Sequence, residues 1–288
     1  MSKPIVLITG ATGQQGGATI RALQRRGYGR IRALVRNPQA PKAVALARSG
    51  VALAQGDLDD ERSLHAALTD VSGVLSVQSP MKIGPAGEER QGKRLARLAA
   101  EHGVRHFVQC SAGGVERESG VPHFESKRAI ERHIADLGLP ATILRPAAFM
   151  ENFSGAVFRL TMLSMMKTFL RPDQTMQLVS VQDVGWFAAE AFERRDRYIG
   201  QSIELAGDSV TPGSAASVLR ASGARPSRGF TLPGMMLARL PEDFRLMFAW
   251  IARDGFRADI QALRRTYPGL LTLAEWAQQN ARGAGRGS

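Results

Sequence analysis

Three glycines near the N-terminus have the spacing of a phosphate-binding loop. They belong to Gly10-Ala11-Thr12-Gly13-Gln14-Gln15-Gly16, which follows the apolar run Ile5–Ile8 and precedes a helical pattern. In that context Gly10 permits a tight turn, and Gly13 lets the backbone approach a pyrophosphate at the helix N-terminus. Gly16 lets the helix pack closely on the strand. The segment therefore predicts a dinucleotide-binding site, and the alternative is a purely structural glycine turn.

An arginine occupies the position that distinguishes the two common dinucleotides. A carboxylate about 20 residues beyond the loop would hold the ribose diol of NAD. This chain has Arg36 there, and no acidic residue occurs between Ala11 and Gln55. A guanidinium can bind a 2′-phosphate through charge-assisted hydrogen bonds, so the sequence predicts NADP(H). The alternative is that Arg36 is one more surface arginine in an arginine-rich chain.

Gly56-Asp57-Leu58-Asp59 follows the third apolar run and suggests an adenine contact. Asp57 is placed to accept a hydrogen bond from the adenine amino group, with Leu58 against the ring. The alternative is that Asp57 and Asp59 only cap the helix expected over residues 60–68.

Several motifs along the chain together resemble the NmrA-like family of atypical short-chain dehydrogenases/reductases. The resemblance covers essentially the whole chain and becomes weak toward the C-terminus. It is carried by Ile8-Thr-Gly-Ala-Thr-Gly-Gln-Gln-Gly-Gly17, Arg32-Ala-Leu-Val-Arg-Asn-Pro38, Gly56-Asp-Leu58, Gln91-Gly-Lys93, Pro122-His-Phe-Glu-Ser-Lys127, Leu144-Arg-Pro-Ala-Ala-Phe-Met-Glu-Asn-Phe153 and Tyr267-Pro-Gly-Leu-Leu-Thr-Leu-Ala-Glu-Trp276.

The resemblance implies further cofactor contacts. It implies that Lys127 binds the nicotinamide ribose hydroxyls and that Arg90 makes a basic cofactor contact. It places two short segments near the nicotinamide half of the cofactor. They are Gln78, Ser79 and Pro80 along the ribose and phosphates, and Phe149, Met150, Glu151 and Asn152 at the nicotinamide.

The catalytic residues implied by the resemblance depart from the usual pattern. Typical short-chain dehydrogenases carry Tyr-x-x-x-Lys on one helix face, with a serine at the end of the fifth strand. This chain has Lys127 and Ser111 at those positions, but His123 where the tyrosine is expected. The three tyrosines lie elsewhere, at Tyr28, Tyr198 and Tyr267. The candidate catalytic residues are therefore Lys127, His123 and Ser111, and a tyrosine relay is in doubt.

Three hypotheses about function remain open. The protein is an NADPH-dependent reductase of a small apolar acceptor such as a quinone or an enone, or it is a non-catalytic NADP(H) redox sensor acting through a protein partner. In the third hypothesis a basic surface adds nucleic-acid contact to either activity. A stripe of Met and Phe could line an acceptor pocket or simply pack the core. The stripe comprises Phe149, Met150, Phe153, Phe158, Met162, Met165, Met166 and Phe169.

Strand and helix patterns alternate through the first half and predict the scaffold for these residues. Strict alternation predicts an α/β fold, a doubly wound parallel Rossmann sheet. The expected strands are Ile5–Ile8, Ile31–Val35, Val51–Ala54, Val74–Val77, His106–Cys110 and Ala141–Leu144. The expected helices are Gly17–Arg26, Glu61–Leu68, Glu88–Glu101 and Phe124–Leu137.

The second half breaks this alternation and predicts a smaller, mostly helical C-terminal cap. Ser180 and Asp183 have capping-box spacing at the start of a helix. The predicted organisation is a Rossmann domain over 1–153, with 176–206 returning to its sheet, a cap over 154–175 and 207–280, and a disordered tail over 281–288.

Composition excludes several classes of protein. The 288 residues carry 38 Lys+Arg against 26 Asp+Glu, a net charge of +12, but the charge is spread along the chain. That spread favours a solvated surface over nucleic-acid binding. The single Cys110 excludes an internal disulfide framework, and Gly103 separates His102 from His106, so no metal site is expected. We expect a cytoplasmic monomer or homodimer without a membrane span.

Overall fold

The computed structural model describes residues 4–284, and the chain divides into two compact units. The first unit comprises Met1–Glu116, Pro122–Arg145 and Val184–Ile203; the second comprises Arg117–Val121, Pro146–Asp183 and Glu204–Ser288. This division assigns 146–153 and 176–183 to the second unit, whereas the sequence grouped them with the Rossmann domain.

The main sheet has seven strands in the order β3-β2-β1-β4-β5-β6-β9. The five pairings from β3 to β6 are parallel, and the order reverses between β1 and β4, as in a doubly wound fold. The strands are β1 (Ile5–Ile8), β2 (Ile31–Val35), β3 (Ala52–Gln55), β4 (Val71–Ser76), β5 (His106–Cys110), β6 (Ala141–Pro146) and β9 (Ser202–Leu205). The predicted Rossmann sheet is therefore confirmed, including the return of 202–205 to its edge.

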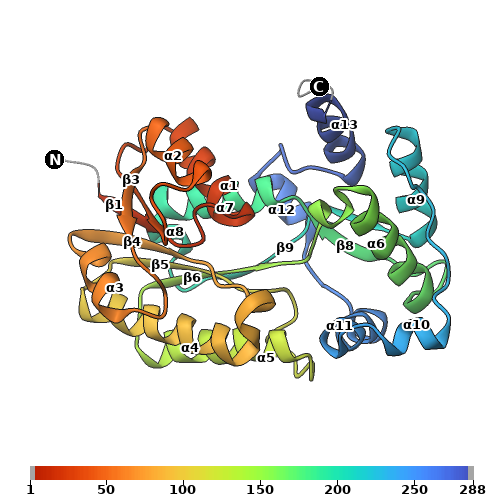
Figure 1. Cartoon of the computed structure of the whole chain (residues 1–288), viewed down its shortest axis with the longest axis horizontal. Coiled ribbons are helices and arrows are strands. Elements are labelled where there is room, and N and C mark those ends of the chain that lie inside the picture. The colour runs from red at the N-terminus through yellow and green to blue at the C-terminus, as the bar shows by residue number, and fades with distance from the viewer. Residues whose placement is uncertain (1–3, 285–288) are drawn as a thin grey trace. The chain divides into compact units, whose positions relative to one another are not determined.

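Helices cover both faces of this sheet, as the alternation predicted (Figure 1). One layer consists of α3 (Glu61–Leu68), α4 (Pro80–Glu101) and α5 (Pro122–Asp136). The other consists of α1 (Gln14–Arg25), α2 (Pro41–Arg48), α7 (Val181–Glu193) and α8 (Arg195–Tyr198). A core of aliphatic side chains, including Leu7, Leu64, Leu95 and Ile130, fills the space between the strands and the first layer. Burial of such side chains is the main stabilising contribution in a fold of this kind.

Several predicted boundaries were wrong by a few residues. The largest error concerns α4, which begins at Pro80 and not at Glu88. Gly84 interrupts this helix with φ of 68° and Pro85 follows it, so the apolar periodicity becomes regular only beyond the kink. α1 begins at Gln14 because Gly13 is its N-cap, and glycines carry no hydrophobic signal.

The second unit contains a small three-stranded sheet in the order β10-β8-β7. Its strands are β7 (Ala148–Phe149), β8 (Met176–Val179) and β10 (Asp208–Val210). The expectation that the whole of 176–206 joins the main sheet is thus wrong for β8. The helices of this unit are the 3-10 helix η1 (Met150–Phe153), α6 (Ala156–Phe169), α9 (Pro212–Ala221), α10 (Gly234–Ala238), α11 (Glu242–Arg253), α12 (Ile260–Thr266) and α13 (Leu273–Ala284). The predicted helical cap is confirmed.

Two local predictions in this region were wrong. Asp183 does not complete a capping box with Ser180, because its Oδ2 accepts from the Leu271 amide at 3.1 Å. The tail was expected to be disordered from Ala281, but α13 continues to Ala284; residues 285–288 lie outside the described residues. Within residues 4–284, no helix is long and apolar enough to cross a membrane.

Candidate functional site

The glycine loop lies at the carboxyl end of β1 and opens α1, as predicted. Gly10 has φ of 59°, and the Gly13 amide donates to the Gly10 carbonyl at 2.9 Å. A Cβ on Gly16 would lie 2.4 Å from the Gly10 carbonyl oxygen, so this residue must be glycine for α1 to start here. Gly10, Thr12, Gly13 and Gln14 are exposed, and the first turn of α1 has no acidic residue. An exposed helix N-terminus of this kind attracts an anion.

Arg36 follows β2 directly and is exposed. Its guanidinium has no hydrogen bond or ion pair with any residue from 4 to 284. Since β1 and β2 are parallel neighbours, Arg36 and the glycine loop lie at the same edge of the sheet. The structure therefore leaves this side chain available for an anionic ligand.

Asp57 follows β3 and makes only local contacts. Its Oδ1 accepts from the Asp59 amide at 2.9 Å, and its own amide donates to Ser63 Oγ. The true N-cap of α3 is Asp60, whose side chain accepts from the Arg62 amide. The alternative that Asp57 and Asp59 cap this helix is thus wrong. The second carboxylate oxygen of Asp57 has no hydrogen-bond partner among residues 4–284. Leu58 is half-buried beside it.

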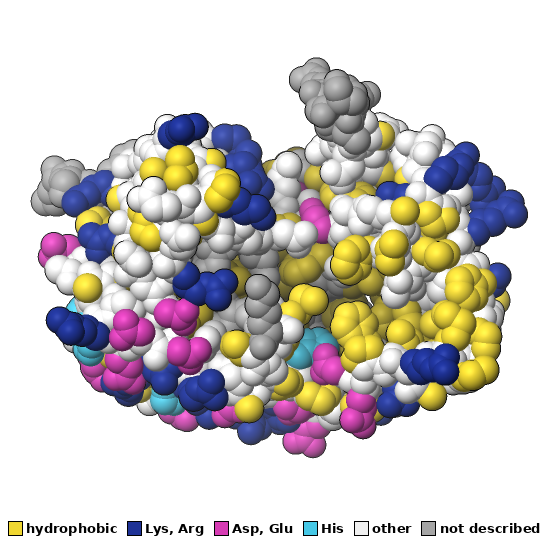
Figure 2. Space-filling view, viewed as in Figure 1, with side chains coloured by type: hydrophobic (Ala, Val, Ile, Leu, Met, Phe, Trp, Pro, Cys, Tyr) yellow, Lys and Arg dark blue, Asp and Glu magenta, His cyan; other side chains and the backbone are white. Residues whose placement is uncertain are grey.

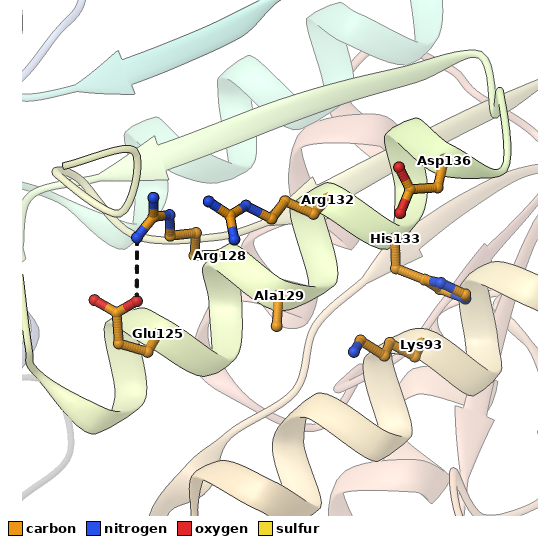
Figure 3. A pocket seen from close by; sticks show the side chains of 7 residues that line it. All are labelled: Lys93, Glu125, Arg128, Ala129, Arg132, His133 and Asp136. Carbon is orange, nitrogen blue, oxygen red and sulfur yellow. Dashed lines mark hydrogen bonds and ion pairs between the residues drawn. The ribbon is translucent and has the colours of Figure 1, made fainter. Parts of the chain in front are cut away.

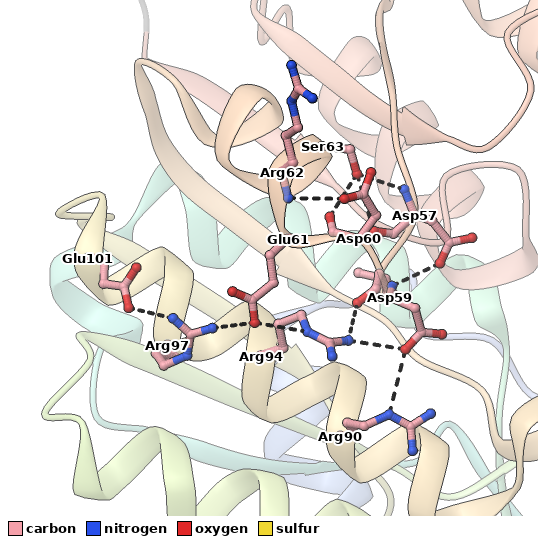
Figure 4. A network of polar contacts seen from close by, with 11 residues as sticks. Asp57, Asp59, Asp60, Glu61, Arg62, Ser63, Arg90, Arg94, Arg97 and Glu101 are labelled. Carbon is pink, nitrogen blue, oxygen red and sulfur yellow. Dashed lines mark hydrogen bonds and ion pairs between the residues drawn. The ribbon is translucent and has the colours of Figure 1, made fainter.

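Arg90 belongs to a network of polar contacts between α3 and α4 (Figure 4). Its Nε lies 3.8 Å from Asp59 Oδ1, and its side chain is 58% exposed. The Asp59 carboxylate also accepts from Gln91 at 2.6 Å and from Arg94 at 3.1 Å. These contacts lower the pKa of Asp59, with the Gln91 hydrogen bond as the largest cause. Arg90 therefore has an alternative partner to the cofactor contact implied for it.

Gln78, Ser79 and Pro80 connect β4 to α4 next to the glycine loop. The side chain of Gln78 is buried and donates to Ser76 Oγ at 2.8 Å, while Gln109 donates to it in turn. Ser79 is the exposed N-cap of α4, and its side chain makes no capping bond. Thr9 Oγ1 donates to the Val77 carbonyl and accepts from the Val77 amide, which fixes this loop against the end of β1.

The three candidate catalytic residues are engaged separately. Lys127 Nζ donates to Glu88 Oε1 at 2.7 Å, and Ser111 Oγ donates to Glu131. His123 lies one turn before Lys127 on α5 and packs edge-on against Phe124, with ring centroids 4.7 Å apart. The structure thus shows the expected helical spacing of His123 and Lys127, but Ser111 is hydrogen-bonded to neither of them.

The Lys127 charge lies close enough to Cys110, at the end of β5, to affect its thiol. Burial raises the pKa of Cys110 to about 12, and Lys127 opposes this change. A thiol protonated at neutral pH is a poor nucleophile. Within the described residues, no three His, Cys, Asp or Glu side chains are grouped to hold a metal ion.

The four residues expected at the nicotinamide belong to the second unit. Met150 is completely buried, and Phe149 and Asn152 are partly buried. Glu151 Oε2 accepts from the Val181 amide at 3.1 Å, and Oε1 accepts from Trp276 Nε1 at 3.2 Å. Burial raises the pKa of Glu151. This carboxylate therefore joins η1 to the start of α7 and to α13 within the unit.

Most of the Met and Phe stripe is core packing. Met150, Phe153, Met162, Met165 and Met166 are buried, in agreement with the structural alternative. Phe158 is 69% exposed and belongs to a larger set of exposed apolar side chains on this unit (Figure 2). The set consists of Val157, Phe158, Phe230, Met235, Met236, Phe244 and Leu246. Helical spacing left both alternatives open because it does not give the depth of a side chain.

A pocket of about 320 Å³ lies on the surface of α4 and α5 (Figure 3). It is lined by Lys93, Glu125, Arg128, Ala129, Arg132, His133 and Asp136. None of the predicted cofactor residues lines it. Its charged side chains are partly neutralised, since Arg128 pairs with Glu125 and Lys93 pairs with Glu89. We assign no function to it.

The chain belongs to the NmrA-like family, whose model matches residues 2–254. This confirms the resemblance inferred from the motifs. A curated relative, an oxidoreductase of Aspergillus hancockii with an NmrA-like family domain, is 35% identical over 159 residues, which are 52% of this chain and 48% of that protein. The chain spans about half the length of the first curated relatives it matches.

Solved structures of the same fold include both reductases and a regulator. An NADPH-dependent quinone oxidoreductase of Escherichia coli, complexed with NADPH, has a TM-score of 0.79 at 24% identity and covers 96% of this chain and 99% of that one. NmrA, a negative transcriptional regulator in complex with NADP, has a TM-score of 0.76 at 20% identity and covers 100% and 99%. At these identities the similarity establishes the fold.

Proposed function

We propose that this protein binds NADP(H) and uses NADPH to reduce a small apolar acceptor such as a quinone or an enone. The observation that carries the cofactor assignment is the Arg36 guanidinium, which has no partner in the part of the chain that the structure describes and lies at the sheet edge that also presents the glycine loop. A 2′-phosphate would be an anionic partner for Arg36. The segment from Ala11 to Gln55 contains no acidic residue, so no carboxylate there would repel this phosphate.

The loop geometry supports a bound pyrophosphate. Gly13 presents backbone without a side chain, Gln14 at the start of α1 is exposed, and the first turn of this helix has no acidic residue. The available Asp57 oxygen, at the end of the neighbouring strand β3, suits the adenine amino group. These residues would hold the adenosine half of the cofactor.

The proposed reduction assigns a limited role to the protein's own groups. When bound, NADPH supplies a hydride at the nicotinamide. Lys127 would bind the ribose hydroxyls. The proton for the acceptor would come from Lys127, His123 or a water molecule. A quinone that receives one hydride and one proton in this way leaves as the hydroquinone.

A second candidate function is NADP(H) sensing without turnover. The specific observation in its favour is that His123 replaces the tyrosine of the usual proton relay. Two tyrosines of the first unit lie elsewhere, because Tyr28 follows the C-terminal end of α1 and Tyr198 ends α8. The regulator NmrA, which has the same fold, was solved with NADP. In this function a regulatory protein partner would take the place of the acceptor.

Oxidation of NADPH by the purified protein, followed by absorbance against a panel of quinones and enones, separates the two functions. We expect turnover with at least one acceptor, and a fall of about 100-fold in kcat/KM for Lys127→Met. Lys93→Met, which removes a lysine from the surface of α4, is the control. Tight NADPH binding without turnover across the panel would contradict the reductase and favour the sensor.

A further inference from the structure

Glu88 is a fully buried carboxylate that no part of the proposed function has used. It lies in α4 and is 0% exposed. Its Oε1 accepts from Lys127 Nζ at 2.7 Å, and its Oε2 accepts from Ser126 Oγ at 2.6 Å. Both partners are in α5, so each carboxylate oxygen is held by a separate donor. A carboxylate with both oxygens bonded in this way has little freedom to rotate.

The close packing of α4 and α5 makes this contact possible. Gly92 stands one helical turn after Glu88, and a Cβ on it would lie 2.4 Å from Ile130 Cδ1. Ile130 in turn follows Lys127 by almost one turn on α5. The absence of a side chain at Gly92 therefore brings the two helices close enough for Glu88 to reach Lys127.

Stability alone does not explain a pair of this kind. Removing two charges from water costs several kcal/mol per ion, roughly what their attraction returns, so buried ion pairs add little net stability. In some proteins such pairs are retained because they fix a geometry. The neighbouring pair Glu89–Lys93 differs, because its side chains are 37% and 39% exposed and only one helix is involved.

The contact leaves Lys127 partly uncommitted. An ammonium group has three N–H donors, and Glu88 is its one hydrogen-bond partner among residues 4–284. The Lys127 side chain retains 11% exposure. Two donors therefore remain, which matches the two hydroxyls of a ribose.

We propose that Glu88 is a positioning residue that fixes the Lys127 ammonium so that its two remaining N–H groups bind the nicotinamide ribose. This inference rests on the proposed binding of NADP(H). It is independent of whether turnover follows, since a sensor would need the same ribose contact. Loss of Glu88 should therefore weaken binding of the nicotinamide half of the cofactor only. A ligand that contains just the adenosine half should bind as before and so serves as the reference.

The test compares two ligands on one set of variants. NADPH contains the nicotinamide ribose, whereas adenosine 2′,5′-bisphosphate lacks it but keeps the 2′-phosphate. Glu88→Gln removes the charge with little change in shape, and we expect its Kd for NADPH to rise about tenfold while its Kd for adenosine 2′,5′-bisphosphate is unchanged. Glu89→Gln, the same change at the next residue, should affect neither ligand.

A double-mutant cycle shows whether Glu88 acts through Lys127. In a Lys127→Met background, Glu88→Gln should cause no further loss of NADPH affinity. If Glu88→Gln is isolated unfolded, Ser126→Ala, which removes only the donor to Oε2, should weaken NADPH in the same selective way by a smaller factor.

Three results would overturn the proposal. The first is an unchanged NADPH affinity in Glu88→Gln, or in Ser126→Ala if Glu88→Gln does not fold. The second is an equal loss of affinity for NADPH and for adenosine 2′,5′-bisphosphate. The third is a loss of NADPH affinity in the Glu88→Gln/Lys127→Met variant that equals the sum of the two single losses. Failure of the wild-type protein to bind either ligand is a different result, and it would contradict the proposed cofactor itself.

Discussion

At the scale of single residues, Arg36 and Lys127 show what a sequence can and cannot reveal about a basic side chain. Arg36 was predicted from its position after β2, and the structure leaves it exposed and unpaired among residues 4–284. Lys127 was inferred from a motif, but its partner Glu88 lies 39 residues away on another helix. Spacing within one helix carries no information about such a contact, because it depends on how two helices pack.

Replacement of Arg36 tests the cofactor preference. Charge-assisted hydrogen bonds contribute about 1.5–3 kcal/mol each, so we expect Arg36→Ala to weaken NADPH binding about 10- to 100-fold. NADH has no 2′-phosphate, and its Kd should stay the same. Fluorescence titration with both reduced cofactors gives the comparison.

Arg48→Ala serves as the control, because Arg48 is an exposed arginine at the end of α2 with no partner among the described residues. It should change neither affinity. Equal losses in the two arginine variants would show that Arg36 contributes only general positive charge.

At the scale of elements, the first βα unit agrees most closely with its prediction. Strand β1 has the predicted limits, and the three glycines take the expected places in the turn and at the start of α1. The kink in α4 was not foreseen, because Gly84 and Pro85 hide the first turns of the helix from the apolar pattern. The separate sheet around β8 was not foreseen either, because it depends on pairing between segments distant in sequence. Local patterns predicted the strands of that region but not their neighbours.

A methyl group on Gly16 should disrupt the loop. The Cβ of Gly16→Ala would lie 2.4 Å from the Gly10 carbonyl oxygen. Because that oxygen belongs to the backbone, it cannot move aside as a flexible side chain could. We expect a loss of about 1–3 kcal/mol in the free energy of unfolding and a fall in NADPH affinity, measured by denaturant unfolding and titration. Gly29→Ala is the control, because its Cβ would have nothing within 4 Å, and it should change neither stability nor NADPH affinity. If Gly16→Ala also left both quantities unchanged, the loop geometry would be refuted.

Asp183 should make the stability of the second unit depend on pH. Burial is the main cause that raises its pKa from 3.8 to about 7, and the Glu151 and Glu275 carboxylates add to the increase; the Leu271 amide and Arg264 oppose it. The folded state therefore holds a proton that the unfolded state releases between about pH 4 and pH 7. Stability is greatest below this range and falls as the pH rises through it, by on the order of 2–4 kcal/mol.

The variant Asp183→Asn removes this dependence. Its amide oxygen can still accept from Leu271, so we expect a higher thermal midpoint than wild type at pH 8 and no difference near pH 4. Asp208→Asn is the control, because Asp208 also accepts from a backbone amide, that of Leu273 at 2.8 Å, but is only half-buried. If the difference in thermal midpoint between wild type and Asp183→Asn were the same at every pH, the raised pKa of Asp183 would be contradicted.

At the scale of the whole molecule, the fold class could be predicted but the limits of the two units could not. The alternation of strands and helices specified the Rossmann sheet. The chain crosses between the units five times, after Glu116, Val121, Arg145, Asp183 and Ile203, and the pattern of strands and helices does not mark these positions. Several arginines, including Arg26, Arg94 and Arg145, form ion pairs within the first unit, whereas Arg36 has no partner among residues 4–284.

Transfer of isotope from cofactor to product tests the central claim most directly. The purified protein is mixed with NADPH deuterated at the transferable C4 position and with a quinone or enone acceptor, and the reduced acceptor is examined by mass spectrometry and NMR. For an enone, where the added hydrogen stays on carbon, a reductase predicts deuterium in the product from one of the two C4-labelled stereoisomers only. Tight NADPH binding with no reduced product from any quinone or enone would contradict the reductase and leave cofactor sensing as the function.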